Sequence, residues 1–304
     1  MNKWLPLLTG VLVFFAVSCV EAERPAGGDR IELRAEVGEI RYLTRGTPVE
    51  SVYDAFSVWA WIWETERNTP NYLCGETFTR TGSSTWKSDF PHGKVLPGYQ
   101  LQLWALGPAG AQGVSDLPKA TTYGAPGFSF TTPSDVSAQT DLMAALSEVY
   151  DGTPSLLTLR FRHLLSCLQF RTTEEVTGAV VSVEVTDVCA QGTYREGEGW
   201  ISVSDPQAFV ADGLQDALLL LPQTLGSEAK LRVTVEQGSV RQVLTASLAD
   251  LPLPEGCRTE ILLSFPSPGS LRLEVSVSPW TAGPEFLDQG CEGLFPSSPT
   301  RRQG

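Results

Sequence analysis

Histidine is almost missing from this chain, because only His92 and His163 occur among its 304 residues. They stand roughly seventy residues apart in the sequence, so neither a histidine-rich metal site nor a Ser-His-Asp arrangement is indicated. The sequence also lacks a G-x-S-x-G nucleophile motif, a phosphate-binding P-loop, a dinucleotide-binding glycine fingerprint and an EF-hand loop. We therefore predict no catalytic residue, no metal ion and no cofactor, and expect a protein that is not an enzyme.

Adjacent carboxylates do occur, at Glu174 and Glu175 and at Glu196 and Glu198. Glycoside hydrolysis needs two carboxyl groups held ~5 to 9.5 Å apart across a cleft. Both pairs lie in polar, turn-like stretches, so we expect them to be solvated loop residues.

Basic residues are too few to form a binding surface for polyanions. The chain has 22 Lys and Arg against 35 Asp and Glu, and its formal net charge is −13. An acidic protein of this kind has no electrostatic attraction for nucleic acid or for anionic lipid. We therefore predict no nucleic-acid partner.

The six cysteines show no paired C-x-x-C spacing, so a zinc site is not indicated. Setting aside Cys19, discussed next, leaves an odd number: Cys74, Cys167, Cys189, Cys257 and Cys291. An odd number cannot all pair within one chain. Disulfides in an exported protein and buried thiols both remain open.

Long apolar runs are absent except at the start of the chain, from Trp4 to Val17. This run is shorter than the ~20 residues that a membrane-spanning helix needs, so we interpret residues 1–18 as an export signal that is removed. Lys3 is the one charged residue in this segment, so its removal would change the formal net charge of the chain from −13 to about −14. The polar, glycine-containing residues 19–29 are expected to be a flexible tether.

The end of this signal, Ala16-Val17-Ser18-Cys19, resembles a bacterial lipobox, in which a small residue precedes a cysteine that is acylated and becomes the new amino terminus. We predict lipid attachment, including palmitate, at Cys19. Each buried methylene of the acyl chains would add ~0.8 kcal/mol to membrane binding. The alternative is an ordinary secretory signal followed by an unrelated cysteine.

Helical periodicity is scarce, whereas short apolar or alternating runs separated by Gly, Pro, Asp and Ser predict an all-β protein. The predicted strands are 31–37, 55–63, 85–87, 100–106, 155–161, 168–171, 179–185, 218–221, 230–236, 241–248, 258–265 and 271–277. Only residues 139–149 are expected to be helical or turn-rich. The turn residues that follow predict a boundary near residue 155, with domains at 30–154 and 155–288 and a polar tail at 289–304.

The predicted strand from Phe56 to Trp63 is apolar on both faces. Because side chains alternate along a strand, Phe56 and its i+2 neighbours point to one face and Trp59, Trp61 and Trp63 to the other. Such a strand must be covered on both sides or expose a row of tryptophans. We favour packing against a neighbouring segment or subunit, and the alternative is a candidate aromatic groove in which these tryptophans stack on carbohydrate.

Several motifs in order along the chain resemble the fimbrillin family of Bacteroidetes surface proteins. The matching segments are LQLWALGP at 101–108, QTDLMAA at 139–145, LRFRHLLSCLQF at 159–170, Gly192-Thr193-Tyr194 followed by Trp200, Leu221 to Thr224, and Val275 to Gly283. The resemblance covers most of the predicted mature chain. His163 stands in a segment that is similar to the family's Leu-x-Phe-x-His element, and we therefore expect it to be a packed, structural histidine and not a general base. It implies two tandem, transthyretin-like Greek-key β-sandwich domains, exported as an outer-membrane lipoprotein that is displayed on the cell surface or built into a fimbria.

Family subunits can polymerise by strand exchange, after an arginine-specific protease cuts behind the first strand and that strand leaves. Arg45 stands at the matching place, in the turn-like gap between the first predicted strand and the tryptophan-rich strand. The resemblance therefore implies cleavage at Arg45 and other fimbrial subunits as partners. The alternative is an accessory or tip lipoprotein that does not polymerise and binds a glycan or another host or bacterial surface ligand.

Overall fold

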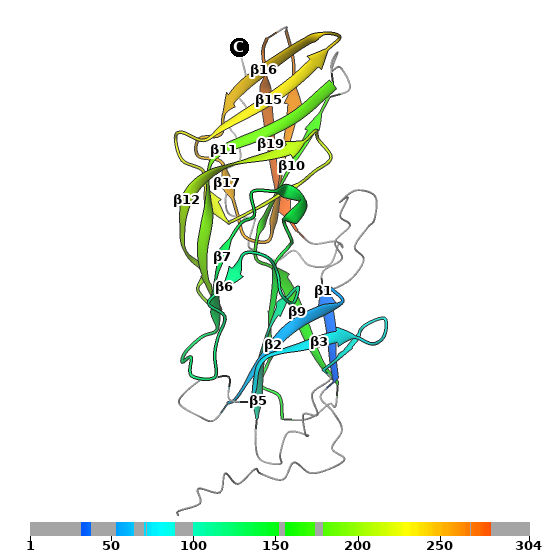
Figure 1. The fold of residues 1–304 in the computed structure, drawn as a ribbon, viewed down its shortest axis with the longest axis vertical. Helices are drawn as coiled ribbons and strands as arrows, with labels where there is room; N and C mark the ends of the chain where they lie inside the picture. The colour runs from blue at the N-terminus through cyan, green and yellow to red at the C-terminus, as the bar shows by residue number, and fades with distance from the viewer. Residues whose placement is uncertain are drawn as a thin grey trace, which may run out of the picture.

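The structure is a computed structural model that describes residues 32–37, 53–63, 70, 72–88, 100–151, 156–173, 179–267 and 269–280. Its shape is elongated, with a barrel at the lower end of Figure 1 and two packed sheets at the upper end. Strands dominate both ends, and within the described residues the one named helix is the short 3-10 turn η1 (Val136–Ala138). The predicted all-β class is confirmed.

Seven strands form the closed barrel. In order around it they are β1 (Glu32–Val37), β4 (Thr85–Lys87), β3 (Leu73–Arg80), β2 (Ala55–Ile62), β5 (Leu101–Gly107), β8 (Met143–Leu146) and β9 (Leu156–His163). The barrel encloses an apolar core that includes Phe56, Phe78 and Trp86. A closed ring leaves no sheet edge open. The sequence predicts a sandwich here, whereas these strands are continuous around one barrel.

The upper half consists of two sheets and a small ribbon. The larger sheet has the order β16 (Val240–Ser247), β15 (Lys230–Gln237), β11 (Ala179–Arg195), β7 (Gly127–Thr131) and β6 (Val114–Ser115), and β12 (Gly199–Asp212) pairs with β11. The smaller sheet has the order β13 (Leu218–Leu220), β10 (Ser166–Thr172), β18 (Cys257–Ser264) and β19 (Arg272–Pro279). The ribbon pairs β14 (Gln223–Thr224) with β17 (Pro252–Leu253). Buried side chains from both sheets share one apolar core, which makes this half a sandwich.

The two halves exchange strands across the predicted boundary at residue 155. Strand β9 follows that point in the sequence, yet it pairs with β1 and β8 and closes the barrel. Strands β6 and β7 precede it, yet β7 pairs with β11 in the upper sheet. A division at residue 155 would therefore separate strands that are hydrogen-bonded to each other in one sheet. Hydrogen bonding between distant segments decides which sheet a strand joins, and the order of the strands in the sequence does not. The division into two independent domains stays a prediction.

A third apolar cluster lies between the halves. Trp59, Trp61 and Trp104 come from the outer face of the barrel, and they meet Phe128 and Tyr194 from the upper sheet. Trp59 and Trp104 have ring centroids 5.0 Å apart, and Phe128 and Tyr194 have centroids 5.3 Å apart. Contacts of this kind add to the area that the rings bury, so the junction is packed like a core.

The expected helical or turn-rich segment at 139–149 is wrong at its centre, where the chain forms strand β8. Met143 and Ala145 contribute to the barrel core while Ala144 contributes to the cluster between the halves. Both faces of this short strand are thus buried. Pairing with β5 and β9 overrides the helical preference of Met, Ala and Leu.

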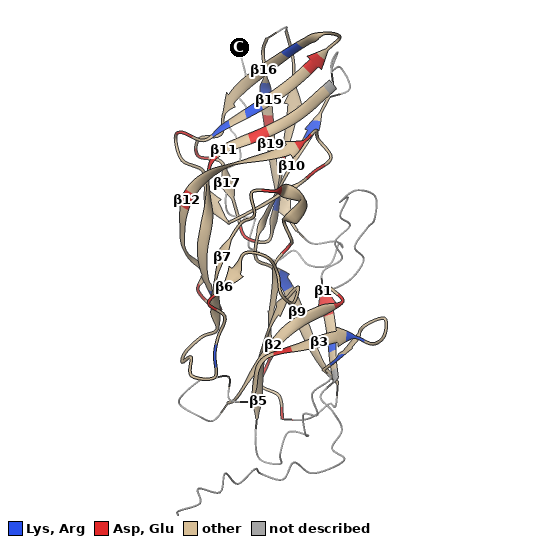
Figure 2. Cartoon of the chain, viewed as in Figure 1, with Lys and Arg blue, Asp and Glu red and all other residues tan. Residues whose placement is uncertain are grey.

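Charged side chains lie on both halves, and acidic and basic segments are interspersed over the upper sheet in Figure 2. Arg232 pairs with Glu184 at 3.2 Å and Arg241 with Glu236 at 3.9 Å on that sheet. These pairs are solvent-exposed and contribute little to stability.

Candidate functional site

Strand β1 completes the barrel. Along its whole length it pairs in parallel with β9, from Glu32 opposite Leu156 to Val37 opposite Phe161. On its other side it pairs with β4 at only two positions, where Leu33 stands opposite Trp86 and Arg34 opposite Thr85. The strand is therefore held mainly by one neighbour.

The side chains of β1 alternate between core and solvent, as expected for a strand. Leu33 is completely buried and Ala35 is 6% exposed, and both belong to the barrel core. Arg34 and Glu36 are exposed. Without β1, the core would face solvent beside the unpaired backbone of β9, with Trp86 and Leu159 among the uncovered side chains.

Two predicted site residues, Cys19 and Arg45, lie outside the described residues. Arg45 follows β1 in the sequence and precedes β2. A cut after Arg45 would therefore separate β1 from the rest of the barrel in the covalent chain.

The three predicted groove tryptophans have different surroundings. Trp59 is 2% exposed and Trp61 is 4% exposed, whereas Trp63 is 44% exposed. The connection between β6 and β7 covers the first two, and Trp59 Nε1 donates a hydrogen bond to the carbonyl oxygen of Pro118 at 2.9 Å. The predicted alternation along this strand is confirmed, and its tryptophan face packs against a neighbouring segment.

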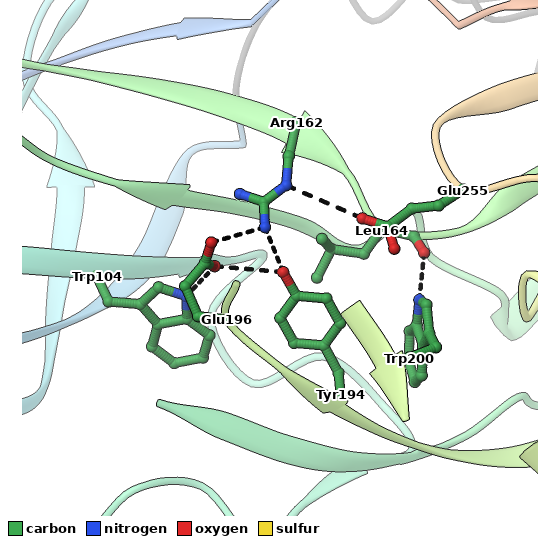
Figure 3. Close-up of polar contacts among 7 residues, drawn as sticks. All are labelled: Trp104, Arg162, Leu164, Tyr194, Glu196, Trp200 and Glu255. Atoms are coloured by element: carbon green, nitrogen blue, oxygen red, sulfur yellow. Dashed lines mark hydrogen bonds and ion pairs between the residues drawn. The ribbon is translucent and has the colours of Figure 1, made fainter. Parts of the chain in front are cut away.

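A partly buried polar network joins the barrel to the upper sheet (Figure 3). Glu196, in the turn between β11 and β12, accepts a hydrogen bond from Arg162 of β9 at 2.8 Å. It also accepts from Trp104 Nε1 of β5 at 3.0 Å and from the Tyr194 hydroxyl at 3.2 Å. Arg162 donates to the same hydroxyl. Each buried polar group in this set has a partner, as a stable network requires.

The prediction that Glu196 is a solvated loop residue is wrong. Its side chain is only 9% exposed, whereas that of Glu198, two positions on, is 54% exposed and pairs with Arg195 on the surface. The signal for this difference is the aromatic residue Tyr194 on the same side of the hairpin. A polar residue next to a buried aromatic residue at the end of a strand, such as Glu196 beside Tyr194, can be buried in the same contact between the halves.

The other side of Arg162 faces Glu255, in the turn between β17 and β18, with Nε and Oε1 3.9 Å apart. Burial raises the pKa of the Glu255 carboxyl to about 7, although Arg162 acts in the opposite direction. Burial also raises the pKa of Tyr194, again opposed by Arg162. Burial lowers the pKa of Arg162, but Tyr194 and the two carboxylates outweigh it, so the net shift is upward. This arginine thus remains charged and serves as the cation of the junction.

Close by, Trp200 Nε1 donates a hydrogen bond to the carbonyl oxygen of Leu164 at 2.6 Å, in the segment that leads from the barrel into β10. Trp200 is the second residue of β12, so the indole fixes the upper hairpin to the chain that crosses from the barrel. The rings of Tyr194 and Trp200 also have centroids 5.5 Å apart, so the two parts of the Gly192-Thr193-Tyr194 and Trp200 motif are in contact. Its residues form one face of the junction.

His163 is the packed histidine that the sequence predicts. It is 6% exposed, its Nδ1 lies 2.7 Å from Asp141 Oδ2, and its ring stacks on Trp280 with centroids 4.2 Å apart. The Tyr53 hydroxyl donates to the backbone oxygen of Asp141. Burial raises the pKa of the Asp141 carboxyl, and His163 lowers it. The pair lies within the packed junction, where it fixes the end of β9 and the end of β19.

The described residues contain no group of three or more His, Cys, Asp and Glu placed to hold a metal ion. Within the same part of the chain, no helix has the length and apolar character required to cross a membrane.

A model of the family described as fimbrillin-like matches residues 44–280 of this chain. The chain belongs to the fimbrillin-like family. This fimbrillin-like chain is therefore a structural protein and not an enzyme. No curated protein sequence matches it.

Two solved structures share the fold of this fimbrillin-like protein. A candidate cell adhesion protein from Bacteroides ovatus has 14% sequence identity and a TM-score of 0.62, with 84% of this chain and 99% of the other covered. A second candidate cell adhesion protein, from Bacteroides uniformis, has 16% identity and a TM-score of 0.57, with 83% and 99% covered.

Proposed function

We propose that this protein is a structural or adhesive subunit of a cell-surface fimbria, assembled by donor-strand exchange. Family membership and the similarity to the two candidate adhesion proteins support the surface role. The single observation that carries the exchange mechanism is that β1 both completes the barrel and precedes Arg45 in the chain.

Before cleavage the protomer would be self-complemented. Strand β1 supplies Leu33 and Ala35 to the core and satisfies the backbone of β9, so the closed barrel offers no acceptor edge. After cleavage, loss of β1 would leave an apolar groove flanked by unpaired donors and acceptors. A strand from another subunit with apolar residues at alternate positions would satisfy both, which is the physical basis of strand addition.

Export and anchoring would precede assembly. In this proposal, Cys19 carries the acyl chains that hold the protein at the outer membrane, and residues 19–29 space β1 from the lipid. Cleavage after Arg45 would release the folded part together with its new amino terminus, because the lipid and β1 lie on the same side of the cut. Anchoring and polymerisation would then be successive states of the same chain.

Incubation of the purified protein with an arginine-specific protease tests the proposal. We expect a new amino terminus at Gly46, loss of the fragment that contains β1, and multimers that resist detergent. The variant Arg45→Ala should abolish all three results, and Arg41→Ala is the matched control that should leave them unchanged.

Two results would count against this mechanism. Intact protein that resists cleavage at Arg45, or cleaved protein that stays monomeric at high concentration, would remove strand exchange. The remaining function would then be that of an accessory surface lipoprotein that does not polymerise. Ligand binding by such a protein would be examined by a tryptophan fluorescence shift on adding oligosaccharides, with Trp63→Ala as the variant that should remove it.

A further inference from the structure

Strand β19 is an open edge of the smaller sheet. It pairs antiparallel with β18 along its whole length, from Arg272 opposite Ser264 to Pro279 opposite Cys257. On its other side, no strand of the described chain pairs with it. An open edge presents a row of backbone N–H and C=O groups to which a further strand can bind.

The core-facing side chains of β19 are partly uncovered at this edge. Leu273 stands opposite Leu263 and Val275 opposite Ile261, and both of these β18 residues are completely buried. Directly opposed residues lie on the same face of a sheet, so Val275 faces the core of the sandwich. It is nevertheless 43% exposed. A further strand beyond β19 would cover this apolar surface.

The sequence along this edge is complementary to itself. From Leu271 to Val275 it reads Leu-Arg-Leu-Glu-Val, so that apolar residues alternate with two opposite charges. In an antiparallel pair centred on Leu273, a second copy would place its glutamate opposite Arg272 and its arginine opposite Glu274. It would also place its first leucine opposite Val275. Opposite charges and apolar side chains in directly opposed positions stabilise a strand pair.

The two charged side chains are exposed and are therefore accessible to a second chain. The Arg272 side chain is 70% exposed and that of Glu274 is 60% exposed, and they form an ion pair of 3.6 Å within one chain. An exposed ion pair of this kind contributes little to stability. Exchanging it for ion pairs between two chains therefore costs little.

The other edges of the upper sheets lack this pattern in the part of the chain that the structure describes. Strand β12 carries Asp205, at a φ of +62°, and Pro206 in its middle, and such an interruption opposes pairing with a further strand. Strand β16 has Arg241 as its one charged residue, so a two-fold pairing would bring no acidic residue opposite it. Strands β13 and β6 have only three and two residues. The edge that suits a second copy is therefore β19.

We propose that β19 is a self-association surface, on which two copies of this chain pair edge to edge as antiparallel strands centred on Leu273. The same segment serves both partners, so the contact is two-fold symmetric and closes at two copies. It joins the smaller sheets of the two copies into one continuous sheet. This association does not depend on strand exchange, which is proposed to occur at β1 in the barrel.

The direction of β19 determines how the two copies lie. The turn before it approaches the β15–β16 hairpin, where a Cβ at Gly269 would lie 3.3 Å from Gln242 Nε2, and this hairpin is at the end of the upper half that is far from the barrel (Figure 1). The strand ends next to Trp280, whose ring stacks on His163 at the junction. Antiparallel pairing therefore directs the two barrels to opposite ends of the dimer and leaves β1 outside the contact.

Sedimentation equilibrium of the full-length chain with Cys19→Ala and Arg45→Ala tests the proposal. In this variant neither the predicted lipid nor the predicted cleavage can bring two chains together. Interfaces below ~1,200 Å² are typically weak, so we expect conversion from monomer to dimer at concentrations up to ~1 mM. Because the charges are exposed, the dimer should weaken at high salt.

Reversal of either charge should weaken the dimer. Arg272→Glu and Glu274→Arg, each added to this background, should raise the dissociation constant roughly tenfold or more, since both opposed ion pairs become like-charged. Arg241→Glu on the edge strand β16 is the matched control and should leave the association unchanged. All three side chains are exposed, so each variant should fold, and far-ultraviolet circular dichroism checks this.

Restoring opposite charges should restore the dimer. The double variant Arg272→Glu/Glu274→Arg again places opposite charges face to face in the proposed register. An equimolar mixture of the two single variants does the same in a heterodimer. Both samples should therefore regain the affinity that each single variant loses. Hydrogen exchange of the wild-type edge at residues 271–275 should slow as the protein concentration rises.

Three results would overturn this inference. A chain that stays monomeric up to ~1 mM would show that the edge is left open or is covered by another part of the chain. A dimer that neither charge reversal weakens would associate through another surface. A dimer that both reversals weaken and neither exchange restores would exclude the register centred on Leu273. Each result is obtained without lipid or cleavage, so it is distinguishable from a failure of the proposed function.

Discussion

Arg162 and Glu196 lie in opposite halves of the molecule and form an ion pair of 2.8 Å in which the glutamate is 9% exposed and the arginine 45% exposed. The arginine comes from the strand that closes the barrel, and the glutamate from the hairpin of the upper sheet. Trp104 and Tyr194 donate to the same carboxylate. This carboxylate is therefore the common acceptor of the junction.

Replacing Glu196 with Ala should destabilise the protein by about 1–3 kcal/mol, because the part-buried hydrogen bonds from Trp104 and Tyr194 lose their acceptor, whereas the Arg162 side chain is 45% exposed and solvent screens the loss of its countercharge. Urea unfolding followed by tryptophan fluorescence measures the change. Glu198→Ala is the matched control in the same turn, since its exposed pair with Arg195 is worth about 0–1 kcal/mol. Equal effects of the two substitutions would show that the network does not hold the halves together.

The free energy of unfolding should fall as pH rises from about 4.5 to about 7, because the pKa of Glu255 differs between the unfolded and the folded chain. The pKa of this carboxyl is raised from 4.5 to about 7 in the folded chain. Between these values the folded chain holds a proton that the unfolded chain has released, so the free energy of unfolding decreases with increasing pH. Because the side chain is 30% exposed, we expect a loss of about 1–2 kcal/mol.

Unfolding of Glu255→Gln between pH 4.5 and pH 8 checks this slope. The variant should be less dependent on pH than the wild-type protein, while the exposed substitution Glu228→Gln should leave the dependence unchanged. A wild-type profile that rises toward pH 7 and is not altered in Glu255→Gln would contradict the assignment.

Leu33→Ala should weaken the barrel by about 2–5 kcal/mol, since it removes a completely buried side chain from β1. Arg34→Ala changes the neighbouring, exposed position on the same strand and should cost no more than about 0.5 kcal/mol. Chemical denaturation of both variants gives the comparison. Similar values would mean that β1 does not pack into the core as described.

Gly192→Ala should disturb the junction through Trp200. A Cβ at Gly192 would lie 2.8 Å from Cε3 of that indole and 3.1 Å from Leu221 Cδ1. Overpacking of this kind costs about 1–3 kcal/mol, and the near-ultraviolet circular dichroism of the tryptophans should change. Gly226→Ala is the control, because its nearest neighbour would be Asp187 Oδ2 at 3.5 Å. An unchanged spectrum in Gly192→Ala would show that the indole can move aside freely.

The sequence predicts many of the strands because their apolar patterns are local. Thr85–Lys87 has the predicted bounds, and Lys230–Gln237 extends one residue beyond them. Strand β3 is missed because Gly75, with a φ of +78°, interrupts its pattern where the register with β2 shifts. This bulge inserts one residue and breaks the alternation on which the prediction depends.

Strand β12 is missed for a different reason. Asp205, at a φ of +62°, and Pro206 stand in its middle and indicate a turn. A proline is tolerated there because β12 pairs only with β11 among the described strands. The side of β12 that faces away from β11 has no neighbouring strand among them, so no inter-strand hydrogen bond is lost there when the proline lacks an N–H. Whether a strand lies at an edge is a property of the assembled sheet and cannot be predicted from local sequence.

The candidate site is predictable in part. His163 is expected to be packed because it lies in the segment that resembles the family's Leu-x-Phe-x-His element, and the structure confirms this. The burial of Glu196 is not predictable, since its partners Trp104 and Arg162 lie 92 and 34 residues away in the sequence. Contacts at such separations depend on the closure of the barrel onto the upper sheet.

Because strands cross between the halves, a division of the gene at residue 155 would not give each half all of its strands. A gene fragment ending at residue 154 would encode a barrel without β9, and the fragment after it would encode an upper sheet without β6 and β7. Each product would expose a hydrophobic seam that invites aggregation. Evolution by swapping one half between related subunits would therefore succeed only if the two short crossing segments were exchanged together with their sheets.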